Sequence, residues 1–133
     1  MFNLNNDLYL KIKEITKKLF KFEKDAGDSV GLNRSEAKVI SYLLDNDKLT
    51  HTQIVTMCEA DKSAISRVLS KMEKKGLIQS TYSENNKKTL YANLTQAGKQ
   101  IAENLKEAYD KCVNDLFGKL TKKDKEVIKK ISV

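Results

Sequence analysis

Apolar residues recur every three or four positions along most of the chain, which is the period of amphipathic helices. The first predicted helix covers residues 5–24, and its narrow apolar seam consists of Leu8, Ile12, Ile15, Leu19 and Phe22. Gly27 and Gly31 are expected to end this helix. Because the seam is narrow, we expect it to be buried against other helices, either of the same chain or of a second copy.

Two shorter helices with recognisable start signals follow. Asn33 can cap the first while Glu36 reaches back to it, and this helix should bury Val39, Ile40, Leu43 and Leu44 before the polar run 45–47 ends it. Thr50 and Gln53 form a second capping box. The short helix that it starts has Ile54, Met57 and Cys58 on one side.

The stretch 61–78 has the clearest two-sided pattern. Its apolar side consists of Ile65, Val68, Leu69 and Met72, and its opposite side of Ser63, Arg67, Ser70 and Lys74. Asp61 should cap this helix and Gly76 should end it. A short helix, a tight turn and a longer helix form a helix-turn-helix, whose second helix lies in the DNA major groove. Arg67 is one of only two arginines among 25 basic residues, and arginine can make a bidentate contact with guanine.

The period changes to two after Ile78. Alternating residues, namely Ile78, Ser80, Tyr82, Leu90, Ala92 and Leu94, predict two strands of a hairpin around a polar tip at 84–88. This tip carries Lys87 and Lys88 and suits a phosphate backbone or a minor groove. A helix-turn-helix followed by such a hairpin is a winged helix. Amphipathic helices return after Thr95 and Thr121, and their apolar surface exceeds what a small lobe can cover, which favours self-association.

Charge narrows the choice of partner. The chain of 133 residues has a net charge of +7, and residues 61–88 carry seven basic and three acidic side chains. This surplus favours an anionic partner such as nucleic acid or a membrane surface. No apolar run reaches the roughly 20 residues that span a bilayer, and no signal pattern is visible, so we expect one cytoplasmic domain without a membrane partner.

Catalytic chemistry has no support in the sequence. There is no glycine-rich phosphate loop and no nucleophile with a paired base, so neither an enzyme nor a cofactor is expected. The two cysteines, Cys58 and Cys112, do not have the spacing of a disulfide framework or of metal ligands. His51, the only histidine, has no cluster of metal-ligating residues around it, and no metal site is predicted.

The run from Leu49 to Gly98 resembles the MarR family of bacterial winged-helix regulators. The resemblance lies in KSAISRVLSKMEKKGLI and in the LT-x-x-G signature of Leu94, Thr95 and Gly98. It implies a mainly α fold with a small β-hairpin, in one domain over 1–133. A winged helix-turn-helix DNA-binding lobe would cover 32–95, flanked by dimerisation helices at 1–31 and 96–133. It also implies a homodimer that binds a pseudo-palindromic operator in double-stranded DNA as a repressor, with release by a small-molecule effector.

The same resemblance places Ser63, Ser66 and Arg67 at base edges and phosphates, and the wing in the adjacent minor groove. The complete set of residues expected at the DNA is Thr52, Lys62, Ser63, Ala64, Ser66, Arg67, Ser70, Lys71, Lys74, Asn86, Lys87 and Lys88. The chain departs from the family in the wing, where Asn86 and Lys88 replace the usual Asp-x-Arg. Lysine is more strongly hydrated than arginine, which favours a phosphate contact over minor-groove readout.

Other functions are compatible with parts of this pattern. A DNA-binding architectural protein without sequence preference fits the lysine excess. A winged helix that binds protein would more naturally have an apolar or acidic recognition face. A redox-responsive regulator would use Cys58 or Cys112, but both lie on apolar faces where a small buried hydrophobe is expected. Peroxide sensors of the family have a cysteine near the start of the first helix, and this chain has none there.

Overall fold

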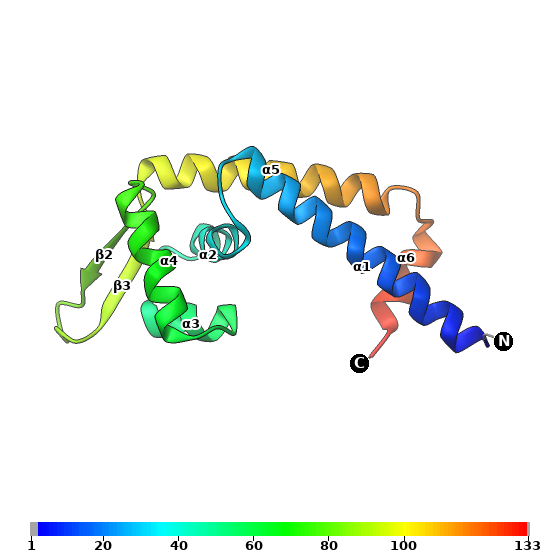
Figure 1. Ribbon diagram of the computed structural model, residues 1–133, viewed down its shortest axis with the longest axis horizontal. Helices are drawn as coiled ribbons and strands as arrows, with labels where there is room; N and C mark the ends of the chain where they lie inside the picture. Colours follow the sequence, from blue (N-terminus) through cyan, green and yellow to red (C-terminus); the bar gives the residue numbers. More distant parts are fainter. Residues whose placement is uncertain (1–2, 133) are drawn as a thin grey trace.

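Helices dominate the part of the chain that the computed structural model describes, residues 3–132. The helices are α1 (Leu4–Ser29), α2 (Arg34–Asp45), α3 (His51–Cys58), α4 (Lys62–Lys74), α5 (Gln96–Phe117) and α6 (Lys122–Lys130). Figure 1 shows a lobe at one end, built around α2, α3 and α4, from which α1 and α5 extend together as an arm. The mainly α fold with a small β-hairpin is therefore confirmed.

Helix α1 is longer than its sequence pattern predicts. It continues past Lys24 and through Gly27 to Ser29, and Gly31 then takes the left-handed conformation at a φ of 74°. Glycine is needed at position 27 of the helix, because a Cβ there would lie only 2.8 Å from the carbonyl oxygen of Leu32. The backbone N–H of Leu32 donates to the carbonyl oxygen of Gly27 at 2.9 Å and closes the last turn.

Both predicted capping boxes are present. Asn33 Oδ1 accepts from the backbone N–H of Glu36 at 2.9 Å, and Glu36 Oε1 accepts from that of Asn33 at 3.0 Å. Thr50 and Gln53 make the same exchange at the start of α3, at 3.0 and 2.8 Å. The predicted cap at Asp61 is wrong in part, because Asp61 occupies the capping position of α4 but its side chain makes no capping hydrogen bond.

The predicted hairpin forms two strands of a three-stranded antiparallel sheet. Strand β2 (Ile78–Tyr82) pairs with β3 (Leu90–Leu94), and β3 also pairs with β1 (Leu49–Thr50) on its other edge. The sequence did not predict β1, because two residues are too few to show a period. Thr50 ends this strand and also caps α3, so the sheet fixes where the helix-turn-helix begins.

The core of the lobe lies between α2, α3, α4, the sheet and the first half of α5. Its largest fully buried apolar side chains are Val39, Ile40, Ile54, Leu69, Met72 and Leu105. Glu36 is buried among them at 1% exposure, and Lys75 Nζ at the end of α4 donates to its carboxylate at 2.8 Å. Burial raises the pKa of Glu36, but the hydrogen bonds from Lys75 and Asn33 outweigh that effect and hold it below its ordinary value.

The LT-x-x-G signature joins the end of α4 to the start of α5. Thr95 caps α5, and its hydroxyl donates to the carbonyl oxygen of Gly76 at 2.6 Å. Its backbone N–H donates to the carbonyl oxygen of Leu77 at 3.0 Å. Gly98 lies directly against that carbonyl, where a Cβ would overlap the oxygen. Residues 94–98 therefore anchor the lobe to the arm.

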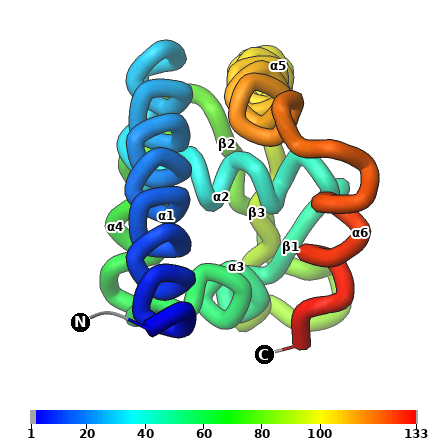
Figure 2. Tube along the Cα trace, turned by 90° about the vertical axis from the view of Figure 1, so that its right-hand side faces the viewer, coloured from blue at the N-terminus to red at the C-terminus, as the bar shows by residue number. Residues whose placement is uncertain are grey.

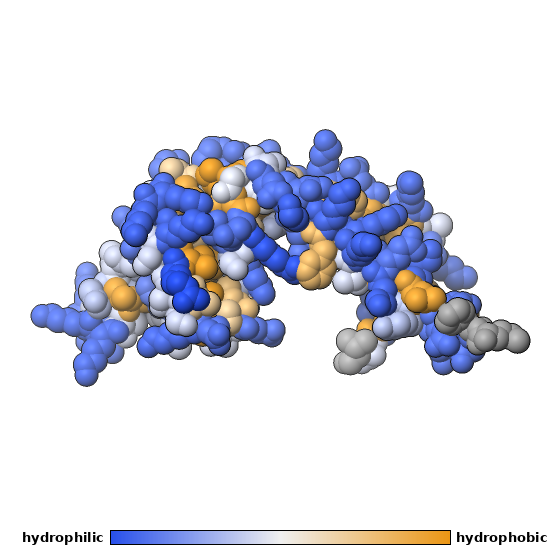
Figure 3. Space-filling view, viewed as in Figure 1, coloured by the Kyte–Doolittle hydropathy of each residue, from blue (hydrophilic) through white to orange (hydrophobic). Residues whose placement is uncertain are grey.

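The arm leaves many apolar side chains uncovered. Those on α1 include Leu4, Leu8 and Ile12, and those of the C-terminal segment are Val127, Ile128 and Ile131, all at least half exposed. Helix α6 has no buried residue, and Figure 2 shows it on the opposite side of the arm from α1. In the space-filling view of Figure 3, hydrophobic patches interrupt the hydrophilic surface near this end of the arm.

Candidate nucleic-acid interface

Helix α4 has the two faces that its sequence predicts. Ile65, Leu69 and Met72 are buried in the lobe, while Ser63, Arg67, Ser70 and Lys74 are exposed. On the exposed side, a shallow groove is lined by Ser66, Arg67, Ser70, Lys71 and Lys74. Short hydroxyl side chains beside a guanidinium and two ammonium groups can hydrogen-bond base edges and neutralise phosphates.

The wing presents its lysines at the tip of the hairpin. Lys87 and Lys88 are exposed there. Asn86 Oδ1 accepts from the backbone N–H of Lys88 at 3.0 Å, so the amide oxygen of Asn86 is used in holding the turn. The lysine side chains are therefore the groups at this tip that are best suited to contact a phosphate.

The other residues predicted to face DNA differ in their exposure and in their position relative to the groove. Thr52 and Lys62 are exposed at the first turns of α3 and α4, whereas Ala64 is half-buried. The groove on α4 brings together five of the predicted residues, but neither Thr52 nor the wing tip lines it. The contribution of every one of these predicted residues to DNA binding, the five in the groove included, stays a prediction.

One residue beside this surface is outside the predicted set of DNA-binding residues. His51, at the start of α3, lies between α4 and β2, where its Nε2 is 3.1 Å from Ser80 Oγ. Burial lowers the pKa of His51, although the nearby carboxylate of Glu73 opposes this shift. The alternation of β2 marked Ser80 as facing one side of the hairpin, but no local pattern indicated that His51 would meet it.

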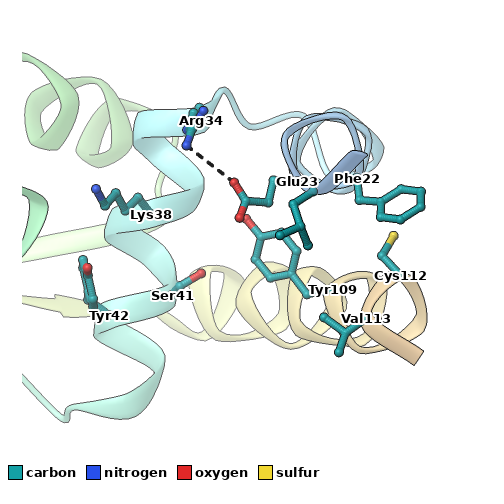
Figure 4. Close-up of a pocket in the computed structure, with 10 residues that line it drawn as sticks. Phe22, Glu23, Arg34, Lys38, Ser41, Tyr42, Tyr109, Cys112 and Val113 are labelled. Carbon is teal, nitrogen blue, oxygen red and sulfur yellow. Dashed lines mark ion pairs between the residues drawn. The ribbon is translucent and has the colours of Figure 1, made fainter. Parts of the chain in front are cut away.

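A separate cavity of about 370 Å³ lies between α1, α2 and α5. Figure 4 shows Glu23 from α1 facing Arg34 from α2, with the ring of Tyr109 from α5 beside them. The two charged groups approach to 3.6 Å. Leu19, Phe22 and Val113 add apolar walls. Burial, together with the negative charge of Glu23, raises the pKa of Tyr109.

The two cysteines differ in their surroundings. Cys58 is buried at the end of α3, and burial raises the pKa of its thiol despite the nearby charge of Lys38. Cys112 is half-buried in the wall of the cavity between α1, α2 and α5. Within residues 3–132, no three His, Cys, Asp or Glu side chains are grouped to hold a metal ion. No helix in the same range is long and apolar enough to cross a membrane.

The fold and the basic face of α4 are those of a winged-helix protein. The chain belongs to the family described as sugar-specific transcriptional regulator TrmB, which matches residues 28–95, just over half of its length. It is 30% identical over 87 residues to YhjH, an uncharacterized HTH-type transcriptional regulator from Bacillus subtilis strain 168. That match covers 65% of this chain but only 50% of YhjH, so the chain spans about half the length of this relative.

Solved structures confirm the MarR fold that the sequence resembles. AbsC, a MarR family transcriptional regulator from Streptomyces coelicolor, superposes with a TM-score of 0.82 at 18% identity, covering 98% of this chain and 90% of AbsC. A mutant MarR from E. coli complexed with operator DNA superposes with a TM-score of 0.77 at 18% identity, covering 96% and 94% of the two chains. At these identities, the likeness establishes the shared fold.

Proposed function

We propose that this protein regulates transcription by binding a specific operator in double-stranded DNA as a homodimer, with α4 in the major groove. The observation that carries this proposal is the groove on the exposed face of α4, where Arg67 lies among two serines and two lysines. Arg67 and the serines supply discrimination between bases, while the lysines of α4 and of the wing supply attraction that depends on salt. The solved complex of an E. coli MarR with operator DNA supports this use of the fold.

The arm supports the homodimer. Its exposed apolar residues lie on both α1 and the segment around α6, and α6 has no buried residue in the single chain. Apolar surface on two separate helices is stabilised when a second copy covers both. A two-fold dimer places its two α4 helices at half-sites about one helical turn of DNA apart, roughly 34 Å, and so requires a pseudo-palindromic operator.

The cavity between α1, α2 and α5 is the candidate site for an effector that releases the protein from DNA. Its lining combines the apolar side chains of Leu19, Phe22 and Val113 with polar and charged groups. Glu23 and Arg34 approach to 3.6 Å within it. Apolar walls with a few polar groups suit a small amphipathic organic ligand.

The main alternative is an architectural protein that binds DNA without sequence preference. The net charge of +7 and the lysines at the wing tip favour this reading. Arg67 argues against it, because a guanidinium in a groove lined by hydroxyls is suited to base recognition. A redox-responsive regulator has weaker support at Cys58, where burial favours the unreactive thiol.

Selection of bound fragments from a random DNA library tests the proposal. The purified protein is incubated with the library at physiological salt and with an excess of non-specific competitor. We expect an inverted repeat with half-sites about one helical turn apart. Recovery of no motif, together with binding that vanishes as salt rises, would support the architectural alternative.

A further inference from the structure

Tyr82, near the outer end of the hairpin, is an exposed aromatic residue that the arm does not explain. It is 62% exposed, and every other large hydrophobic side chain exposed within residues 3–132 belongs to α1, to α5 or to the segment around α6. Figure 1 shows the hairpin at the opposite end of the molecule from α6 and the start of α1. A second copy that covers the arm therefore leaves Tyr82 uncovered.

The side chain of Tyr82 lies on the face of the hairpin that is turned towards the helices. Ile78, Ser80 and Tyr82 share one face of β2, because side chains alternate along a strand. On this face Ile78 is buried in the core, and Ser80 Oγ is 3.1 Å from Nε2 of His51 in α3. Tyr82 continues the same face two residues farther out, where the lobe no longer covers it.

A second groove connects this part of the hairpin to the groove on α4. Ser66 and Ser70 line both grooves, and Leu90 of β3 lines the second one. Leu90 pairs directly with Tyr82, so the aromatic ring extends the wall that Leu90 begins. The acidic residue of this groove, Glu73, is in the last turn of α4 beside the joint with the hairpin, whereas Tyr82 is at the other end of β2.

The backbone of Tyr82 is also available to a ligand. Thr95 donates its backbone N–H to Leu77 at 3.0 Å and Ser83 donates its own to Thr89 at 2.8 Å, so the odd-numbered residues of β2 bond to β3. Tyr82 then directs its N–H and C=O groups away from β3. Because β2 is at the edge of the sheet, these groups point out of it. A backbone N–H is a common donor to DNA phosphates.

We propose that Tyr82 binds the sugar-phosphate backbone of DNA between the two grooves, with its ring against a deoxyribose and its hydroxyl and backbone N–H as donors to phosphate oxygens. This inference rests on the proposed function. If α4 lies in the major groove and the wing tip in or beside the adjacent minor groove, the DNA strand that separates them crosses the outer part of the hairpin. Lys87 and Lys88 outnumber Glu84 at the nearby tip and attract that strand.

Tyr82→Phe tests the hydroxyl. We expect binding to weaken about two- to tenfold, the range for one net hydrogen bond, on the selected operator and on random DNA alike, because every phosphate is the same acceptor. The salt dependence should stay at its wild-type value, because a neutral hydroxyl releases no counterion. Tyr82→Ala removes the ring as well and should weaken binding further. Fluorescence anisotropy titrations of both duplexes at several salt concentrations provide the measurement.

Tyr91→Phe is the matched control. Tyr91 is next to Leu90 in β3 but on the opposite face of the hairpin, where Lys48 Nζ lies 4.4 Å from the centre of its ring. The same loss of a hydroxyl on that face should leave the affinity for DNA at the wild-type value. Melting temperatures of all the variants show whether a weaker complex reflects a lost contact or a lost fold.

Hydroxyl-radical footprinting on the selected operator locates the contact. The wild-type protein should protect the sugars between the major groove at α4 and the minor groove at the wing. In Tyr82→Ala these sugars should become reactive, while those beside α4 stay protected. If the library selection yields no motif, the affinities for random DNA still decide the inference, since the proposed contact is independent of sequence.

Several results would overturn the inference. Wild-type affinity in both Tyr82→Phe and Tyr82→Ala would remove Tyr82 from the interface and leave the proposed function standing. A loss confined to the operator would make Tyr82 a base-reading residue. A change in the sedimentation of DNA-free Tyr82→Ala would show that the edge of β2 binds another protein strand instead. A wild-type protein that binds neither duplex would reject the proposed function and the inference together.

Discussion

At the scale of single residues, Arg67 decides between specific and non-specific binding. Replacement by alanine should weaken binding to the selected operator by about 1–3 kcal/mol and affect random DNA less, because a bidentate contact to guanine exists only at the correct base. Lys87→Ala is the control, since loss of a phosphate contact should weaken both complexes equally and reduce the salt dependence. Titrations of both duplexes at several salt concentrations provide the measurement. Equal losses in Arg67→Ala would make Arg67 a phosphate contact.

His51 links stability to pH. Burial holds its pKa below the ordinary value of 6.5 in the folded protein, whereas the unfolded chain takes up a proton near that value. The contribution is therefore fully present above pH 6.5 and decreases as the pH falls through 6.5 towards the folded pKa. Urea unfolding between about pH 7.5 and about pH 5.5 should show a smaller loss of stability in His51→Gln than in the wild type. Parallel losses in the two proteins would contradict this assignment.

At the scale of elements, the joint between α4 and α5 depends on a missing side chain. A Cβ at Gly98 would overlap the carbonyl oxygen of Leu77, and the backbone on both sides is fixed by hydrogen bonds from Thr95. Gly98→Ala should lower the free energy of unfolding by more than about 3 kcal/mol, measured by urea denaturation. Gly76→Ala is the control: nothing lies within 4 Å of the added Cβ, and only the positive φ of 74° opposes it, for about 1–2 kcal/mol.

The elements themselves were largely predictable because their signals are local. Capping residues three positions apart and apolar residues at helical spacing identified α2, α3 and the faces of α4. The failures have equally local reasons. Strand β1 has only two residues, which are too few to show a period. Gly27 was expected to end α1, but its role is to leave room for the backbone of Leu32 beside the helix.

At the scale of the whole molecule, the exposed apolar side chains of the arm predict a homodimer. Ile12→Glu or Ile128→Glu would place a charge in an apolar interface and should convert the homodimer to a monomer at micromolar concentration, measured by sedimentation velocity. Leu10→Glu is the control, because Leu10 is exposed at 47% but lies outside the seam of Leu8 and Ile12. A wild-type protein that sediments as a monomer would reject the dimer, and a dissociated Leu10→Glu would show that the seam is wrongly placed.

The candidate interface was also predictable as a surface, since the exposed face of α4 follows from its helical period and its charges from the residues themselves. The cavity and several polar contacts elsewhere in the lobe were not predictable, because they join side chains from elements far apart in the chain. Glu36 meets Lys75 at a separation of 39 residues, His51 meets Ser80 at 29, and Lys38 meets Cys58 at 20.

Local patterns in the sequence determined which segments of this protein are helical, where they are capped and which face of α4 is basic, because each of those properties depends on residues within one or two helical turns. The tertiary structure alone decided that Lys38 and Tyr42 both line the cavity and hold α3, and that Glu36 is buried against Lys75. Such pairs depend on the packing distances and angles between separate elements, and neither is encoded in the spacing of residues along the chain.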